Sequence, residues 1–104
     1  MAVTDGVAFS FRLYVAGEAV NSAQALANLQ ALCRGHLAGR HCIEVVDVFR
    51  EPERALADGI FMTPTLLRLA PSPVRKIVGT LSETATLIQA LELSQVGGLA
   101  STRR

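Results

Sequence analysis

The chain has 104 residues, half of them hydrophobic, and a formal net charge of +1 at pH 7. This length predicts one domain that can bury a core without a disulfide or metal staple. The balance of ten Lys/Arg against nine Asp/Glu excludes a basic surface for nonspecific nucleic-acid binding. No apolar run reaches the roughly 18–20 residues of a membrane span, so the mean hydropathy of +0.35 predicts a core or a subunit interface.

The N-terminus has no basic segment followed by an apolar stretch and a cleavage site. We therefore expect no secretory signal and a cytoplasmic protein. Residues 7–15 alternate large apolar side chains with smaller or more polar ones, which predicts the first strand. Asn21 or Ser22 is a candidate N-cap for a helix over residues 23–37, where apolar side chains recur at helical spacing.

Gly35 and Gly39 predict the end of this helix. Residues 42–49 are rich in β-branched side chains and almost apolar on both faces, which is typical of a strand inside a parallel sheet. Strand, helix and strand then form a βαβ unit, expected to be right-handed. The segment Pro52–Asp58 predicts a short helix with proline in its first turn, stopped by Gly59.

Thr63-Pro64 predicts the entrance to a third strand, because proline has no amide hydrogen and biases the preceding residue towards extended backbone. Across all X-Pro bonds the cis form is rare, which favours a trans bond here. Pro71 and Pro73 predict a hairpin loop of about four residues between this strand and a fourth at residues 74–78.

A second amphipathic helix is predicted from Ser82, its candidate N-cap, to Leu93. We therefore expect a domain over residues 7–95, with frayed or disordered ends at residues 1–6 and 96–104. The predicted fold class is α/β with the order βαβαββα, the layout of thioredoxin. Thioredoxin carries two cysteines between its first strand and first helix, and the corresponding loop over residues 16–22 contains none, which excludes dithiol exchange there.

The two cysteines, Cys33 and Cys42, lie outside any C-x-x-C motif, and we expect both to be small buried hydrophobic residues. His36 and His41 flank the same loop, but the spacing of the four side chains does not predict a zinc site. No nucleophile, base and orienting group can be argued from the sequence, so we expect no catalytic residues and no cofactor.

One observation disagrees with the thioredoxin layout. Residues 59–70 are rich in good helix formers, whereas residues 74–78 favour a strand. Tertiary context usually overrides such a conflict, and in a minority of proteins it marks two packings close in free energy.

The chain resembles the KaiB family of circadian clock proteins over residues 9–93. The resemblance is carried by Leu13-Tyr14-Val15-Ala16-Gly17, Thr63-Pro64-Thr65-Leu66 and Pro73-Val74-Arg75, with Pro52 and Gly79 between and after them. It implies a non-enzymatic protein that binds a KaiC-type hexameric ATPase. It also implies a fold-switching chain, in which a βαββααβ ground state, commonly tetrameric, exchanges with a rare thioredoxin-like monomer that binds the ATPase.

The resemblance also implies which residues face a partner. They are the end of the second strand, the short helix after it and two later basic residues: Val48, Phe49, Arg50, Glu51, Pro52, Arg54, Arg68 and Arg75. Arg68 interrupts an apolar strand, so a solvated side chain on the open face of the sheet is an equal alternative to a partner contact. Arg75 and Lys76 have the same two interpretations, and salt should weaken any contact that they make with an acidic patch.

The residues expected to be critical for the fold are Gly17, Pro64, Pro71, Pro73 and Gly79. Three features depart from the family pattern: Gly59 where a lysine is common, Thr80 where an acidic residue is usual, and the basic ending Arg103-Arg104. They favour a homologue from a non-cyanobacterial system. The alternative function is a constitutive thioredoxin-like sensor module that docks a signalling histidine kinase without switching its fold.

Overall fold

The computed structural model describes residues 8–93 and has the predicted order of elements. The strands are β1 (Phe9–Val15), β2 (His41–Asp47), β3 (Thr65–Ala70) and β4 (Arg75–Val78). The helices are α1 (Val20–His36), α2 (Pro52–Ala57) and α3 (Thr84–Ala90). The predicted ends at residues 1–6 and 96–104 lie outside the described residues.

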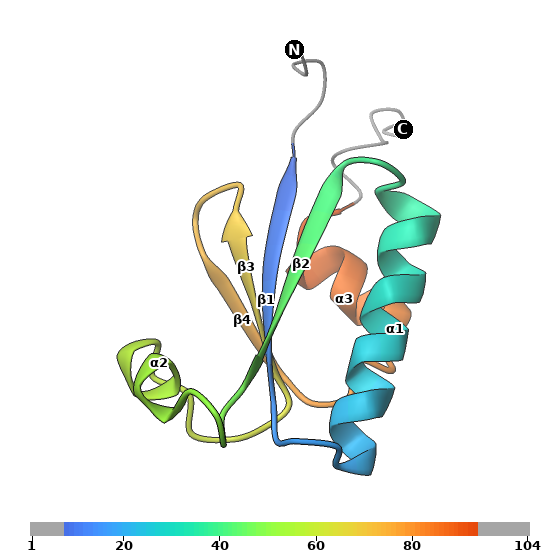
Figure 1. Ribbon diagram of the computed structural model, residues 1–104. Helices are drawn as coiled ribbons and strands as arrows, with labels where there is room; N and C mark the ends of the chain where they lie inside the picture. Colours follow the sequence, from blue (N-terminus) through green and yellow to red (C-terminus); the bar gives the residue numbers. More distant parts are fainter. Residues whose placement is uncertain (1–7, 94–104) are drawn as a thin grey trace, which may run out of the picture.

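The four strands form one sheet in the order β2-β1-β3-β4. β1 pairs in parallel with β2 and antiparallel with β3, and β3 pairs antiparallel with β4. Figure 1 shows α1 and α3 on one face of the sheet and α2 beyond the end of β2. The thioredoxin-like α/β fold predicted from the sequence is therefore confirmed, and so is the loop of four residues between β3 and β4.

Alternation along β1 divides the core between the two faces of the sheet. Phe9, Phe11, Leu13 and Val15 pack in the larger cluster with buried residues of α1 and α3. Tyr14 points to the opposite face, into a smaller cluster with Val46, Ala55, Ile60 and Leu67. This second cluster seats α2 and the loop after it against the sheet.

The position of β2 differs from the prediction. Its apolar run suggested a strand buried on both faces, but β2 is an edge strand, and of its seven residues only Val46 is buried. Cys42 at its start is exposed, so the expectation that this thiol is buried is wrong. A β-branched run indicates that a segment forms a strand, but it does not indicate where that strand lies in the sheet. The position of β2 depends on the later strands, because β3 pairs with the other side of β1.

The ends of the helices also differ. α1 begins at Val20 with no side-chain cap, because the Ser22 hydroxyl is buried and accepts a hydrogen bond from the Ala16 amide at 3.0 Å. Gly35 lies inside α1, which ends at His36. α3 is shorter than predicted and begins at Thr84, while the Ser82 hydroxyl pairs with the Thr80 hydroxyl at 2.7 Å instead of capping the helix.

Five residues were expected to be critical for the fold: Gly17, Pro64, Pro71, Pro73 and Gly79. Gly17 (φ 56°) and Gly79 (φ 123°) have positive φ, which glycine adopts without the strain of a side chain. The peptide bonds before all three prolines are cis, so the trans bond favoured for Thr63-Pro64 is wrong. The general frequency of cis X-Pro bonds takes no account of the surroundings of Pro64. This residue is buried, and its carbonyl accepts a hydrogen bond from the Gly79 amide at 2.9 Å.

Candidate functional site

The turn between β2 and α2 is held by a single carboxylate. Asp47 Oδ1 accepts hydrogen bonds from the backbone amides of Phe49 at 2.9 Å and Gly17 at 3.2 Å. This arrangement directs the Phe49 side chain outward, where it is 74% exposed. A Cβ at Gly17 would lie 3.5 Å from the Phe49 ring, so the ring lies over the loop between β1 and α1.

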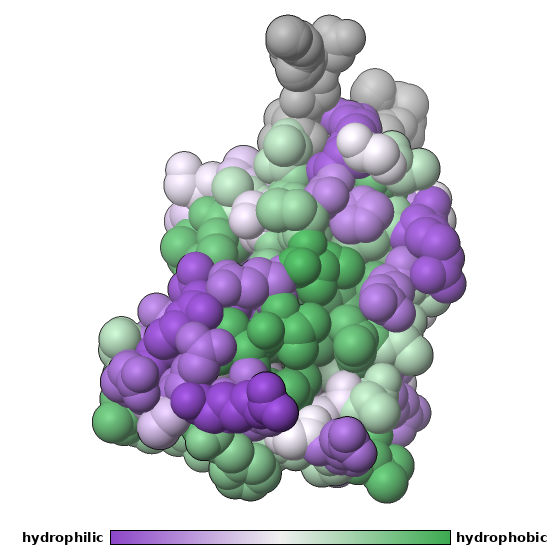
Figure 2. Space-filling model, viewed as in Figure 1, coloured by the Kyte–Doolittle hydropathy of each residue, from purple (hydrophilic) through white to green (hydrophobic). Residues whose placement is uncertain are grey.

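More exposed apolar side chains lie near the same end of the sheet. They come from α2 and from the loop between α2 and β3, and we call them, together with Phe49, the α2 surface: Phe49, Leu56, Phe61 and Met62. Phe61 is 87% exposed, the largest exposed fraction among these residues. Figure 2 shows a hydrophilic band beside α2, and hydrophobic surface over β2 between this band and α1. Large apolar side chains gathered on a surface mark sites of protein association.

A network of charged side chains ties α2 to the sheet. Arg12 pairs with Glu44 at 2.8 Å and with Asp58 at 2.9 Å. Arg54 of α2 pairs with the same Glu44 at 2.8 Å and with Glu51 at 3.2 Å. The α2 surface is therefore presented by a short helix that ion pairs and the second cluster both hold in place.

Tyr14 adds a buried anchor to this network. Its hydroxyl donates to Asp58 Oδ2 at 2.5 Å and also lies 3.1 Å from the Arg54 carbonyl. The Tyr14 hydroxyl, and after it the Arg12 guanidinium, lower the pKa of the Asp58 carboxyl, whereas burial and the Asp58 hydrogen bond raise the pKa of Tyr14.

We expect Asp58→Asn to reduce stability at neutral pH and to flatten its acid dependence. A carboxyl whose pKa is lowered by folding adds stability above its unfolded pKa of about 4 and loses it as the pH falls further. Urea unfolding at pH 7 should show a loss of about 1–3 kcal/mol, and the difference from wild type should shrink towards pH 2–3. Glu53→Gln, at an exposed α2 position, is the control. A constant difference across this pH range would contradict the assignment.

The structure places the eight residues expected to face a partner in four different settings. Phe49 and Arg50 are exposed just before α2, and Pro52 is exposed at its first position. Val48 is half-buried against the second cluster, and Glu51 and Arg54 take part in the ion-pair network. The other two, Arg68 and Arg75, lie on β3 and β4, away from α2.

Arg68 is fully buried, with 0% of its surface exposed, so the alternative of a solvated side chain is wrong. Its guanidinium donates to the Leu91 carbonyl at 2.7 Å and to the Pro73 carbonyl at 2.7 Å. Glu92 lies 3.4 Å from Arg68 and 2.8 Å from Arg75, which is half-exposed. In this fold Arg68 offers no surface to a partner. It joins the hairpin loop and the end of α3 to β3.

Sequence reasoning missed Leu56, Phe61 and Met62. The sequence predicts the strand entrance at Thr63-Pro64 and does not indicate the exposure of the segment before it. Of Ile60, Phe61 and Met62 in that segment, only Ile60 is buried, and the strand begins at Thr65. The signal was the proline at position 64, which separates these residues from the strand. Leu56 follows the buried Ala55 in α2 and is 73% exposed, and the sequence of so short a helix does not show which of the two residues faces the sheet.

The two cysteines are on different elements and in different environments. Cys33 is buried in α1 and Cys42 is exposed on β2, and burial raises the pKa of the Cys33 thiol to about 11. The loop between β1 and α1, where thioredoxins place their cysteines, has none. In residues 8–93 no group of three or more candidate metal-ligating side chains occurs, and no helix there is long and apolar enough to cross a membrane.

We expect iodoacetamide at pH 8 to alkylate Cys42 and leave Cys33 unmodified in the folded protein. The thiolate is the reactive form, and a thiol with a raised pKa and no exposure supplies almost none of it. Mass spectrometry of tryptic peptides should find one adduct in native buffer and two after denaturation in urea. Rapid labelling of Cys33 under native conditions would contradict its position in the core.

The fold and these residues define a thioredoxin-like domain that lacks redox cysteines in its first loop and exposes apolar side chains beside α2. A model of the KaiB domain matches residues 12–93, and the chain belongs to the KaiB family. Membership in this family points to a clock-related regulator and not to an enzyme.

Two curated relatives cover most of the chain. The circadian clock protein KaiB3 of Synechocystis sp. is 36% identical over 86 residues, which span 83% of this chain and 84% of the relative. The circadian clock oscillator protein KaiB of Prochlorococcus marinus is 39% identical over 85 residues, which span 82% of this chain and 71% of the relative.

Solved structures show the same fold at low sequence identity. The N-terminal domain of Synechococcus elongatus SasA aligns with a TM-score of 0.70 and 17% identity, covering 91% of this chain and 88% of that domain. Chloroplastic thioredoxin z aligns with a TM-score of 0.68 and 16% identity, covering 86% of this chain and 78% of that one.

Proposed function

We propose that the protein is a non-enzymatic regulator that binds a KaiC-type hexameric ATPase through the α2 surface. The observation that carries the proposal is the exposure of Phe49, Leu56, Phe61 and Met62 around a helix held in place by ion pairs. Aromatic and methionine side chains are enriched at the centres of protein interfaces, and a prepositioned surface loses less entropy on binding.

The family supports the same surface. Six of the eight partner-facing residues that the resemblance implies lie in the segment 48–54, which leads into α2, whereas Arg68 and Arg75 lie on β3 and β4. The relatives are named as circadian clock proteins, which favours a timing or stress-adaptation role for this chain. A cytoplasmic location, expected from the sequence, is part of the proposal.

The charges around the surface suggest how binding responds to salt. The Arg50 side chain is 85% exposed, and its distance to Asp47 is 3.9 Å, a weak pair. Arg54 is already paired with two carboxylates. An apolar centre with one weakly paired arginine at its rim predicts binding that weakens only modestly as salt increases.

Fold switching is the finer part of the proposal. Residues 59–70 are rich in helix formers although β3 is a strand, which supports a second packing close in free energy. If the thioredoxin-like form is the minor state, only that fraction of the protein can bind, and the apparent affinity for the ATPase is lower in proportion to this fraction. The ground state would then be a self-associated form, a tetramer or a dimer.

The test is complex formation with the KaiC-type ATPase from the same organism. The two proteins are incubated with nucleotide for hours, so that slow refolding can occur, and the mixture is analysed by size-exclusion chromatography with light scattering. A co-eluting complex is the expected result. No complex after long incubation at high concentration would contradict the proposal.

A second candidate is a constitutive adaptor that docks a signalling histidine kinase without switching its fold. The similarity to the SasA N-terminal domain, at a TM-score of 0.70, favours it. NMR spectra at low and high concentration distinguish the two. One set of thioredoxin-like resonances under all conditions supports the adaptor, and slow exchange with a second, self-associated set supports the switch.

A further inference from the structure

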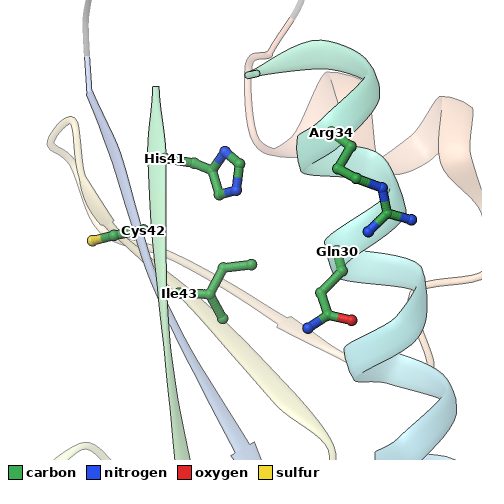
Figure 3. A pocket seen from close by; sticks show the side chains of 5 residues that line it. All are labelled: Gln30, Arg34, His41, Cys42 and Ile43. Atoms are coloured by element: carbon green, nitrogen blue, oxygen red, sulfur yellow. The ribbon is translucent and has the colours of Figure 1, made fainter. Parts of the chain in front are cut away.

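A hollow of about 330 Å³ lies between α1 and the edge strand β2, away from the α2 surface. Its lining residues are Gln30, Arg34, His41, Cys42 and Ile43. Figure 3 shows His41 and Ile43 directed from β2 towards α1, whereas the Cys42 side chain is directed to the other side of the strand. The side chains that line it are mostly hydrogen-bond donors, and no carboxylate is among them.

Arg34 differs from most of the other arginines of the described chain. Arg12, Arg50, Arg54, Arg68 and Arg75 each lie within ion-pair distance of a carboxylate. Within residues 8–93 Arg34 and Arg40 have no such partner. They belong to the segment Arg34-Gly35-His36-Leu37-Ala38-Gly39-Arg40-His41, which contains four basic residues and no acidic one. The positive charge beside the hollow is therefore not neutralised by the part of the chain that the structure describes.

His41 is oriented for a role in this hollow. Its Nδ1 lies 2.9 Å from the Leu37 carbonyl oxygen, which can only accept a hydrogen bond, so Nδ1 carries the hydrogen. The neutral ring then has a bare Nε2, and protonation turns Nε2 into a second donor. Arg34 lines the hollow from α1, Arg40 precedes His41 in the chain, and the partner of His41 on β1 is the uncharged Phe9.

The backbone of β2 supplies further donors. The even-numbered residues of β2 make the backbone hydrogen bonds to β1. At its two ends, the Arg40 carbonyl accepts from the Phe9 amide and the Val48 amide donates to the Val15 carbonyl. Along a strand in a parallel sheet, the backbone N–H and C=O groups of successive residues point alternately to the two sides on which a neighbouring strand can pair. The amides of His41 and Ile43 therefore point along the open edge, next to the hollow.

We propose that this hollow binds a tetrahedral oxyanion such as a phosphate group, held by Arg34, Gln30, His41 and the edge amides of β2. The donors come from a helix, from an imidazole and from strand backbone, so they approach an anion from several directions and not in one plane. That arrangement suits a tetrahedral anion better than a planar carboxylate. The site is separate from the α2 surface and does not depend on the ATPase-binding proposal.

The first experiment is an NMR titration of the ¹⁵N-labelled protein with inorganic phosphate, with acetate at the same ionic strength as the comparison. We expect saturable shifts confined to the amides around residues 30, 34 and 40–44, and little response to acetate. Arg34→Gln should weaken binding about tenfold, the loss expected for one charge-assisted hydrogen bond. Arg50→Gln, at another exposed arginine, just before α2, should leave it unchanged.

Titration with ADP distinguishes a free phosphate from one carried by a nucleotide. Saturation of the same amides at lower concentration indicates the nucleotide, and equal affinity indicates phosphate itself. Shifts that never saturate, or that spread over all exposed arginines and survive Arg34→Gln, would overturn the proposal.

Sulfate at a fixed pH tests the part played by His41. We expect His41→Gln to weaken sulfate binding while leaving weak binding through Arg34. An unchanged sulfate affinity in His41→Gln would exclude this role for the imidazole.

Discussion

Replacing Arg68 with methionine should destabilise this fold by about 2–4 kcal/mol, the cost of leaving two carbonyl groups without their donor. Methionine fills a similar volume but leaves the carbonyls of Leu91 and Pro73 without their donor. For a domain whose total stability is about 5–15 kcal/mol, this is a large fraction. Urea unfolding followed by circular dichroism measures the change.

The loss should begin where Arg68 makes its contacts. Hydrogen exchange in the variant should rise first in β4 and α3 and least in β1 and α1, because Arg68 connects the hairpin loop and the end of α3 to β3. Arg50→Met, at an exposed arginine with only a distant carboxylate, should change stability by less than about 0.5 kcal/mol. Equal midpoints for the two variants would show that the Arg68 contacts contribute nothing.

Phe61→Ala should weaken binding to the KaiC-type ATPase about 30-fold or more while leaving the fold intact. Truncation of an aromatic residue at the centre of an interface costs about 2 kcal/mol or more. Phe61 is 87% exposed, so its removal takes little from the core. Affinity is measured by fluorescence anisotropy of the labelled protein after incubation long enough for refolding.

The matched control is Val74→Ala. Val74 is also an exposed apolar residue, but it lies in the loop between β3 and β4, at the far end of the sheet from α2. Its substitution should not change the affinity. If both variants bind like wild type, the partner uses another surface. If both bind weakly, a shift in the equilibrium between folds is the cause, and NMR of the free variants would show it.

The order of elements could be predicted from the sequence because it depends on local patterns. The alternation along β1 and the helical spacing of α1 are properties of neighbouring residues, and the structure has both elements close to their expected positions. Pro64 correctly separated the strand β3 from the segment before it. The family could also be predicted, since its motifs are short and contiguous.

The errors concern properties that distant parts of the chain decide. Arg68 looked solvated because the sequence does not show that the end of α3 and the hairpin loop present carbonyl groups to it. β2 looked central because its composition does not reveal that β3 pairs on the other side of β1. The exposure of Phe61 and Met62 depends on where the loop leaves the sheet, and an apolar run alone predicts burial.

β2 connects two ends of the molecule that differ in charge. It begins at His41, beside Arg34 and Arg40, and ends at Asp47, where carboxylates outnumber arginines around α2. The two ends of β2 therefore carry opposite local charge, although the net charge of the chain is close to zero. A charged partner would therefore turn the domain before contact, and an acidic surface would attract the α1 end first. The rate of productive encounter through the α2 surface should then depend on the sign of the charge around the partner's binding site.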